Sequence, residues 1–150
     1  MSSLPGAILF ACNLNRVRSP MAAGLMRRLF GARVFVDSCG LGCTGEEVPD
    51  PFAVASMDEI GVDITRHVAK SFEDLEDASF DVVVSLTPEA HHRAVEFGRR
   101  RSVDIVYWPT MDPTLVSGSR DTMMDAYRAV RDGLELRILD RFPQMRTFGG

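Results

Sequence analysis

Long apolar runs are missing from this sequence, and their absence excludes a class of protein. No apolar stretch approaches the roughly 20 residues that a membrane-spanning helix needs, although 45% of the 150 residues are hydrophobic. The opening stretch, "MSSLPGAILFACNLNR", has no basic segment before its apolar residues and no small-residue cleavage site, so it is not interpreted as a secretory signal. We therefore expect a cytoplasmic protein with no membrane partner.

Cysteine and lysine are also scarce. Three cysteines form no even disulfide framework, and free thiols are expected in the reducing cytoplasm. One lysine accompanies sixteen arginines, and the formal net charge is -4 with a pI near 5.3. This balance argues against a nucleic-acid partner, because phosphate backbones are held by clustered lysine and arginine. The run 99–101, three arginines, is interpreted as a solvent-exposed helix end.

What the sequence does contain is an alternation of short apolar strands and helical segments. Four short, almost continuously apolar runs are typical of strands buried on both faces: 7–12, 33–38, 80–86 and 103–108. Helical spacing follows them, from near Ser19, over 52–61 and 88–98, and beyond Asp121. This order predicts right-handed crossovers and a parallel sheet covered on both sides. The length is that of one domain, so residues 1–150 are expected to form a single α/β domain.

Individual helices carry specific signals. Thr87 and Pro88 are a cap and a first-turn proline for the helix over 88–98. Gly31 is expected to stop the first helix, and the stretches 40–51 and 109–119 are expected to be loops. The last helix is predicted to bury a stripe formed by Met123, Tyr127, Val130, Leu134 and Ile138.

Cys12 lies where parallel sheets bind ligands. It ends the first predicted strand, and a helix begins near Ser19. In open α/β sheets, ligands bind outside the carboxyl ends of the strands. A loop before a helix presents successive N–H groups to an anion, with the helix dipole behind them. The stretch "FACNLNRVRSP" is therefore interpreted as a phosphate-binding loop rather than a core thiol beside an unrelated arginine.

This loop contains the groups that phosphoryl transfer requires. The Arg18 guanidinium is a planar fork that binds two oxygens at once. Its positive charge favours the thiolate of Cys12, which is the nucleophile that this reaction needs. Asp112, followed by proline, comes after the fourth strand at the same end of the sheet. The residues whose amides are expected to surround the phosphate, between Cys12 and Arg18, are Asn13, Leu14, Asn15, Arg16 and Val17.

The sequence resembles the low molecular weight protein tyrosine phosphatase family, whose fold also houses thiol-dependent arsenate reductases. The matching segments are "FACNLNRVRSPMAAGLM", "VDSCG", "PDPFAVASMDEIGVDITRHVAK", "FDVVVSL" and "MDP". The resemblance covers roughly residues 6–141. It implies a three-layer α/β sandwich with a four-stranded parallel sheet, the phosphotyrosine protein phosphatase I-like fold, and a hydrolase that needs no metal and no cofactor.

The resemblance also implies a role for each motif residue. Cys12 would accept the phosphoryl group while Arg18 clamps its oxygens. Asp112 would protonate the leaving oxygen and then activate water. Ser19 would donate its hydroxyl to the sulfur and ease its departure. The members of the polar network that holds the left-handed loop asparagine would be Asn15, Ser19, Ser38 and His67.

Two departures from the family pattern concern the loop itself. Leu14 stands where the family usually has glycine, so the backbone there either avoids positive φ or is strained. Val17 replaces a cysteine that often forms a protective disulfide in the loop. Cys39 and Cys43 are hypothesised to form a reversible bridge to Cys12 instead.

A third departure concerns the substrate. The stretches 42–48 and 112–118 lack the aromatic residues with which family phosphatases line a slot for phosphotyrosine. Tyr107, Trp108 and Phe52 are the candidates to supply such a wall from another direction. His91 and His92 are adjacent on a predicted helix and point about 100° apart, so they are interpreted as solvent-exposed and not as a metal pair.

Three functions compete at this point. The first is hydrolysis of phosphomonoesters, with a phosphotyrosine protein or a small aryl phosphate as partner, through a phosphocysteine on Cys12. The second is arsenate reduction with the same oxyanion-binding loop. Its second thiol would come from outside the chain, or from Cys39 or Cys43, because Thr87 and its neighbours offer no resolving cysteine. The third is a non-catalytic phosphate-binding module, against which the intact Asp112 argues.

Overall fold

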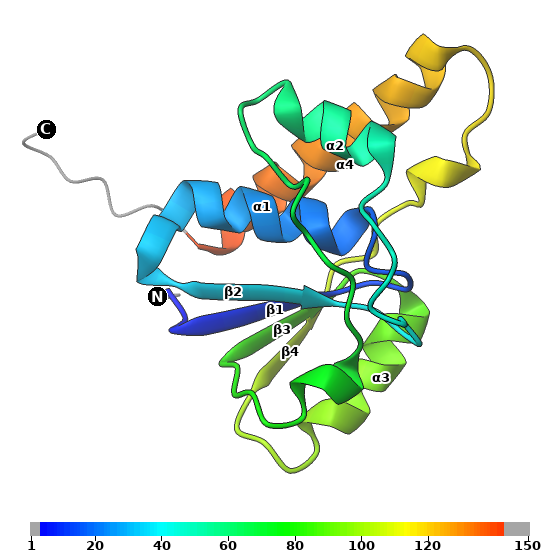
Figure 1. Cartoon of the computed structure of the whole chain (residues 1–150). Helices are drawn as coiled ribbons and strands as arrows, with labels where there is room; N and C mark the ends of the chain where they lie inside the picture. Colours follow the sequence, from blue (N-terminus) through cyan, green and yellow to red (C-terminus); the bar gives the residue numbers. More distant parts are fainter. Residues whose placement is uncertain (1–3, 143–150) are drawn as a thin grey trace, which may run out of the picture.

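Four parallel strands form the centre of the computed structural model, which describes residues 4–142 (Figure 1). Their spatial order is β2-β1-β3-β4, and the register places Ala11 beside both Cys39 and Ser85. This confirms the expected four-stranded parallel sheet. The strands are β1 (Ala7–Ala11), β2 (Phe35–Cys39), β3 (Val82–Ser85) and β4 (Asp104–Tyr107).

Helices cover both faces of this sheet, which confirms the three-layer architecture. Figure 1 shows α1, α2 and α4 on one side and α3 on the other. The helices are α1 (Arg18–Phe30), α2 (Pro51–Asp58), α3 (Pro88–Gly98) and α4 (Arg120–Arg141). Short 3-10 turns lie between them at η1 (Gly31–Arg33), η2 (Phe72–Leu75) and η3 (Pro113–Leu115).

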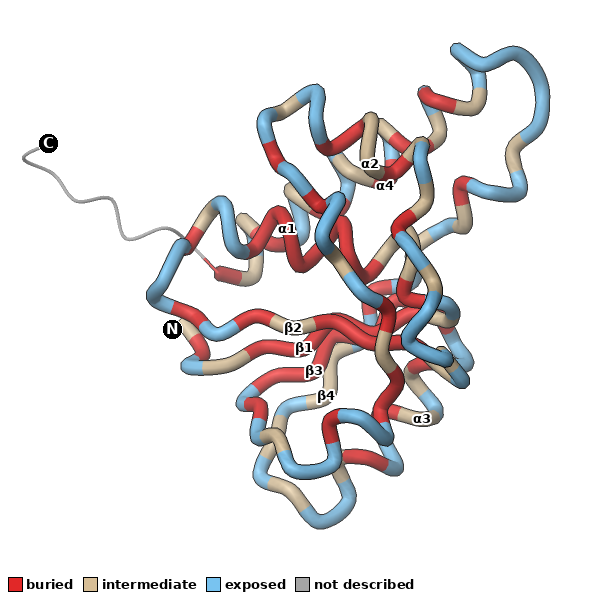
Figure 2. Tube along the Cα trace, in the orientation of Figure 1, coloured by how far each residue is buried: buried red, intermediate tan, exposed pale blue. Residues whose placement is uncertain are grey.

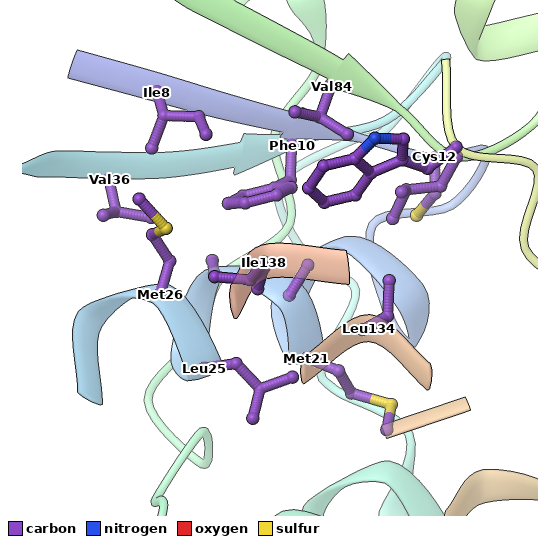
Figure 3. Packing of buried hydrophobic residues seen from close by; sticks show 14 of the residues in the cluster. Ile8, Phe10, Cys12, Met21, Leu25, Met26, Val36, Val84, Leu134 and Ile138 are labelled. Carbon is purple, nitrogen blue, oxygen red and sulfur yellow. The ribbon is translucent and has the colours of Figure 1, made fainter. Parts of the chain in front are cut away.

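The core has two parts because successive residues of β1 point to opposite faces. Phe10 and its neighbours pack with α1 and α4 in the larger cluster, where Met21, Leu134 and Ile138 are buried (Figure 3). Leu9 faces the smaller cluster under α3, with Phe72 and Phe97. Figure 2 shows the central strands as buried, in agreement with their almost continuously apolar sequences. The prediction of burial on both faces is wrong for β4, which lies at the edge of the sheet and has no buried residue.

Several boundaries differ from the sequence prediction for local reasons. The second helix starts at Pro51 rather than Phe52, because the carboxylate of Asp50 caps it by accepting hydrogen bonds from two backbone N–H groups. It ends at Asp58 rather than Gly61, because the chain turns there and Gly61 has a φ of 78°. In α4, Met124 is buried and Met123 only partly so, which moves one member of the predicted stripe by a position.

None of the helices in residues 4–142 has the length and apolar character needed to cross a bilayer.

Two interpretations of surface residues are wrong. His91 is partly buried: its Nδ1 lies 2.8 Å from the Ser85 hydroxyl, and its ring stacks on Tyr107 at 4.7 Å. Arg101 bonds two backbone carbonyls and lies over the ring of Phe97, so only the first two arginines of that run are exposed. In both cases the side chain contacts a neighbouring element, although the local sequence pattern predicts that it is exposed to solvent.

Candidate active site

The loop between β1 and α1 wraps around one buried cysteine. Cys12 is 2% exposed, and its N–H still bonds the carbonyl of Cys39 at 3.1 Å, so the thiol stays fixed to the end of the sheet. Asn15, with φ of 58°, is the one non-glycine residue of positive φ within 4–142. Leu14 therefore avoids the left-handed region, and its side chain costs the loop no backbone strain.

Ser19, on the first turn of α1, holds the sulfur. Its Oγ lies 2.8 Å from Cys12 Sγ and accepts a hydrogen bond of the same length from Asn15 Nδ2. A buried hydroxyl at this distance can donate to a thiolate, and hydrogen bonds to charged groups are stronger than neutral ones. The family resemblance implied this pairing of Cys12 and Ser19.

Asn15 is fixed from four sides. Its Nδ2 also donates to the Ser38 hydroxyl at 3.0 Å, and its Oδ1 accepts the N–H of Lys70 at 3.0 Å. The Nε2 of His67 lies 2.7 Å from the Asn15 carbonyl, and a carbonyl only accepts, so His67 carries its proton on Nε2. The structure thus brings Asn15, Ser19, Ser38 and His67 together in one buried network, as the motif comparison implied.

His67 is held largely neutral by its surroundings. Burial lowers the pKa of its imidazole, and the positive charges of Lys70 and Arg27 lower this pKa further. The bond to the Asn15 carbonyl opposes that shift. The neutral Nε2–H tautomer is therefore the form that supports the loop at neutral pH.

Arg18 and Asp112 meet at the opening of the loop. Arg18 Nη1 donates to the carbonyl of Thr110 at 2.8 Å, and Nη2 lies 3.8 Å from Asp112 Oδ2. The other carboxylate oxygen of Asp112 accepts from the backbone N–H and the hydroxyl of Thr114, at 2.9 and 2.6 Å. One oxygen of Asp112 is thus anchored, while the other faces Arg18.

These residues line a cleft of about 280 Å³. Its lining consists of Cys12, Asn13, Leu14, Arg16, Val17, Arg18, Asp50, Asp112 and Thr114. No aromatic side chain within 4–142 is part of that lining. The three candidates for a wall are used elsewhere: Phe52 stacks on Tyr127, Trp108 packs against Phe10, and Tyr107 stacks on His91.

Comparison with known proteins agrees with this geometry. A sequence model of low molecular weight phosphotyrosine protein phosphatases matches residues 7–141. The chain belongs to the low molecular weight phosphotyrosine protein phosphatase family. The arsenate reductase of Halalkalibacterium halodurans is 30% identical over 131 residues, which are 87% of this chain and 91% of that protein.

Other proteins that are similar to this chain differ from one another in activity. The glutaredoxin arsenate reductase of Synechocystis is 35% identical over 79 residues, which are 53% of this chain and 58% of that protein. YwlE of Bacillus subtilis is 28% identical, with a TM-score of 0.72, over 87% of this chain and 91% of that one. YwlE is an arginine phosphatase. The family and its fold are therefore shown, and the reaction has to be argued from the site.

Some contacts around the phosphatase-family loop are not part of the sequence prediction. Asp50 lines the cleft and accepts the hydroxyl of Tyr127 at 3.1 Å. Asn13 is braced from α3: its Oδ1 accepts the Thr87 hydroxyl at 2.7 Å, and its Nδ2 donates to Glu89 at 3.2 Å. Asp50 lies in one of the segments that resemble the family, so the sequence offered a signal for it. The partners of Asn13 lie more than 70 residues away along the chain, and no local pattern points to them.

The two remaining cysteines differ in their access to the nucleophile. Cys39 is fully buried among residues on the α3 face of the sheet, whereas Cys12 belongs to the opposite face. Burial raises the pKa of Cys39 well above its ordinary value. Cys43 is partly exposed and donates to the Leu14 carbonyl at 3.3 Å, and burial followed by Glu47 raises its pKa to about 11. Cys39 contacts the loop through its backbone carbonyl, whereas Cys43 contacts it through its thiol.

Proposed function

We propose that this protein hydrolyses phosphomonoesters through a phosphocysteine intermediate on Cys12. The observation that carries the proposal is the arrangement of four side chains. The sulfur of Cys12 contacts the Ser19 hydroxyl, Arg18 lines the same cleft, and one carboxylate oxygen of Asp112 faces Arg18. A phosphoryl group bound by the loop amides and Arg18 would lie between the thiolate and the carboxyl group.

In the first step, the Cys12 thiolate attacks phosphorus. A sulfur–phosphorus bond forms while the bond from phosphorus to the leaving oxygen breaks. Asp112 donates its proton to that oxygen, so the alcohol or phenol leaves neutral. Its anchoring by Thr114 keeps the second carboxylate oxygen directed toward the cleft.

In the second step, a water molecule replaces the sulfur. The Asp112 carboxylate, now deprotonated, takes a proton from the water as its oxygen attacks phosphorus. The sulfur–phosphorus bond breaks, and the electron pair returns to Cys12 as a thiolate. The Ser19 hydroxyl donates to this thiolate and makes it a better leaving group.

The assay for this proposal is hydrolysis of p-nitrophenyl phosphate in the presence of a chelator. Cys12→Ser is expected to be inactive, and Asp112→Asn is expected to lose about 10² to 10⁴ in rate. Asp121→Asn, an exposed carboxylate at the start of α4, is the matched control and should retain full activity. Full activity in Asp112→Asn would remove the assigned acid, and phosphate binding with no turnover of any aryl phosphate would identify a non-catalytic module.

For the physiological substrate, we propose phosphotyrosine in proteins. Cys12 lines the cleft and is only 2% exposed, so we expect the phosphoryl group to be carried by a side chain that is long enough to reach it. We expect phosphoserine to be too short for such a site. Because the cleft lining is not aromatic and YwlE is an arginine phosphatase, the peptide panel compares phosphotyrosine, phosphoarginine and phosphoserine. A higher kcat/KM for phosphoarginine would overturn the tyrosine assignment and keep the thiol mechanism.

Arsenate reduction is the second candidate, and the arsenate reductases among the relatives favour it. Arsenate has the charge and shape of phosphate and fits the same loop. Cys39 lies on the other face of the sheet from Cys12, so the thiol that completes the reaction would come from outside the chain or from Cys43. Arsenate-dependent consumption of glutathione or reduced thioredoxin tests this reaction directly.

A further inference from the structure

A second cavity, of about 920 Å³, lies apart from the catalytic cleft and shares no lining residue with it. It runs between α1 and the segment 61–70, beside the edge strand β2. The helix is smooth there: a Cβ on Gly24 would lie 3.0 Å from Ile64 and 3.1 Å from Val62. The apolar part of the lining includes Pro20, Val62, Ile64, Val68 and Ala69.

The charged part of this lining is mainly basic. Its basic residues are Arg27, Arg28, Arg66, His67 and Lys70, in a protein whose net charge is -4. Lys70 is the single lysine of the chain. The two acidic residues of the lining are already engaged within the protein. Asp37 pairs with Lys70 at 2.9 Å, and one oxygen of Asp63 accepts both the N–H and the hydroxyl of Thr65.

Two arginines of the cavity lie outside these hydrogen bonds and ion pairs, although the charge of Arg66 acts on the Asp63 carboxylate. Arg28 on α1 and Arg66 in the facing segment are exposed, and neither makes a hydrogen bond or ion pair within residues 4–142. Arg27 Nη2 donates a hydrogen bond to the Val36 carbonyl, and the other nitrogens of this guanidinium remain available for other contacts. The two walls of the cavity therefore present guanidinium groups toward a common space.

Two residues of the cavity lining also support the catalytic loop. His67 lines the cavity, while its Nε2 holds the Asn15 carbonyl, and the N–H of Lys70 holds the Asn15 side chain. The positive charges of Lys70 and Arg27 act on the imidazole and lower its pKa. Because His67 lines the cavity beside these basic side chains, its ring can report an anion bound there.

The geometry points to a binding site for an anion that carries two or more phosphate groups. Guanidinium forks match phosphate oxygens in pairs, and arginines on opposite walls can hold separate phosphates. The volume lies in the range of small-molecule sites, about 300–1,000 Å³, rather than that of a flat macromolecular surface. The apolar strip along Val62, Ile64 and Val68 accommodates an organic body as well as the phosphates. Both a nucleotide and a free polyphosphate share this chemistry.

The test is an NMR titration of the full-length protein without divalent metal. The signals of the His67 ring and the Val68 amide are followed while ATP, pyrophosphate or hexaglutamate is added. Inorganic phosphate is kept constant throughout to occupy the catalytic loop. We expect saturable shifts with ATP or pyrophosphate. A tighter Kd for ATP assigns an organic phosphate, and equal values assign a free polyphosphate.

Charge reversal separates this site from general attraction. The double variant Arg28→Glu/Arg66→Glu is expected to raise the Kd at least tenfold. Arg99→Glu/Arg100→Glu makes the same charge change at the exposed end of α3 and should alter the Kd less than twofold. Equal Kd values in the two double variants would overturn the proposal. Tighter binding of hexaglutamate, or shifts confined to the catalytic loop, would also overturn it, whatever the result of the phosphatase assay.

Discussion

At the scale of single residues, Asn15 shows how a phosphate-binding loop keeps a conformation that most side chains disfavour. Its left-handed backbone would cost free energy in isolation. The carbonyl, Oδ1 and Nδ2 of Asn15 all have hydrogen-bond partners, and the residue is fully buried. The surrounding network therefore over-determines the loop before any substrate binds, which is the preorganisation that electrostatic catalysis requires.

Ser19→Ala tests the hydroxyl that contacts the sulfur. Removing a hydrogen bond to a charged group costs about 1.5–3 kcal/mol, so breakdown of the phosphocysteine should slow roughly ten- to hundredfold. Rapid-mixing assays with p-nitrophenyl phosphate should show a burst of phenolate followed by a slow steady state. Ser56→Ala removes another buried hydroxyl, bonded to the Ala53 carbonyl in α2, and should show no such burst. A burst of equal size in both variants would contradict the role of Ser19.

The lowered pKa of His67 predicts a pH dependence of stability. The pKa of its imidazole in the folded protein lies below the ordinary value of about 6.5. Just below that pH, His67 is therefore protonated more fully in the unfolded chain than in the folded protein. Stability should therefore fall as the pH drops below about 6.5 and be unaffected by this group above it. Urea unfolding at pH 7.5 and 5.5 measures the difference.

His67→Gln is the variant for that measurement, since its amide keeps an N–H donor for the Asn15 carbonyl. It should lose less stability between the two pH values than the wild type. His92→Gln, at a side chain that is 84% exposed, should keep the wild-type dependence. Identical pH profiles for wild type and His67→Gln would show that His67 is not the group responsible.

At the scale of elements, the contact between β2 and the catalytic loop depends on one glycine. A Cβ on Gly40 would lie 2.7 Å from the Asn13 carbonyl and 2.9 Å from the Asn15 nitrogen, both backbone atoms. Gly40→Ala is therefore expected to displace the loop, to cost about 1–3 kcal/mol of unfolding free energy, and to reduce kcat/KM. Gly133→Ala, where no atom lies within 4 Å of the added Cβ, should stabilise α4 by about 0.5–1 kcal/mol and leave activity unchanged.

The elements show where sequence patterns suffice. The bounds of α3 were predicted correctly from Thr87 and Pro88, because the cap and the proline act through local hydrogen bonding and a fixed φ. The start of α2 was misplaced by one residue because Pro51 is tolerated in a first turn that Asp50 caps, and its end by three because the chain turns before Gly61. The position of Cys12 at the end of β1 followed from the apolar run alone, since a parallel sheet aligns its carboxyl ends.

At the scale of the whole molecule, the contacts that complete the site join distant parts of the chain. The Thr87 hydroxyl reaches Asn13 across 74 positions, and Arg18 reaches the Thr110 carbonyl across 92. Periodicity and spacing give no signal for such pairs, because each depends on how separate helices pack on the sheet. For the same reason the sequence left open whether Cys39 or Cys43 lies on the side of the nucleophile. The family motif identified the network residues, whereas the long-range hydrogen bonds that support the loop depend on tertiary packing.

The longest helix is tied to the catalytic cleft by one hydroxyl. Tyr127 on α4 stacks its ring on Phe52 at 5.4 Å and donates to Asp50, which both caps α2 and lines the cleft. Burial followed by the Asp50 charge raises the pKa of this hydroxyl, so it remains a donor throughout the working pH range. Tyr127→Phe keeps the ring contact and removes only the hydrogen bond.

We expect Tyr127→Phe to lose about 0.5–1.5 kcal/mol of unfolding free energy in urea and to lower kcat/KM, because Asp50 then loses its partner from α4. Tyr107→Phe removes a hydroxyl from a tyrosine that is 36% exposed and stacked on His91, away from the cleft lining, and is the matched control. If both variants matched the wild type, the cleft would owe its shape to the loops alone. A loss confined to Tyr127→Phe would show that a helix more than 70 residues downstream helps to hold the loop that binds substrate.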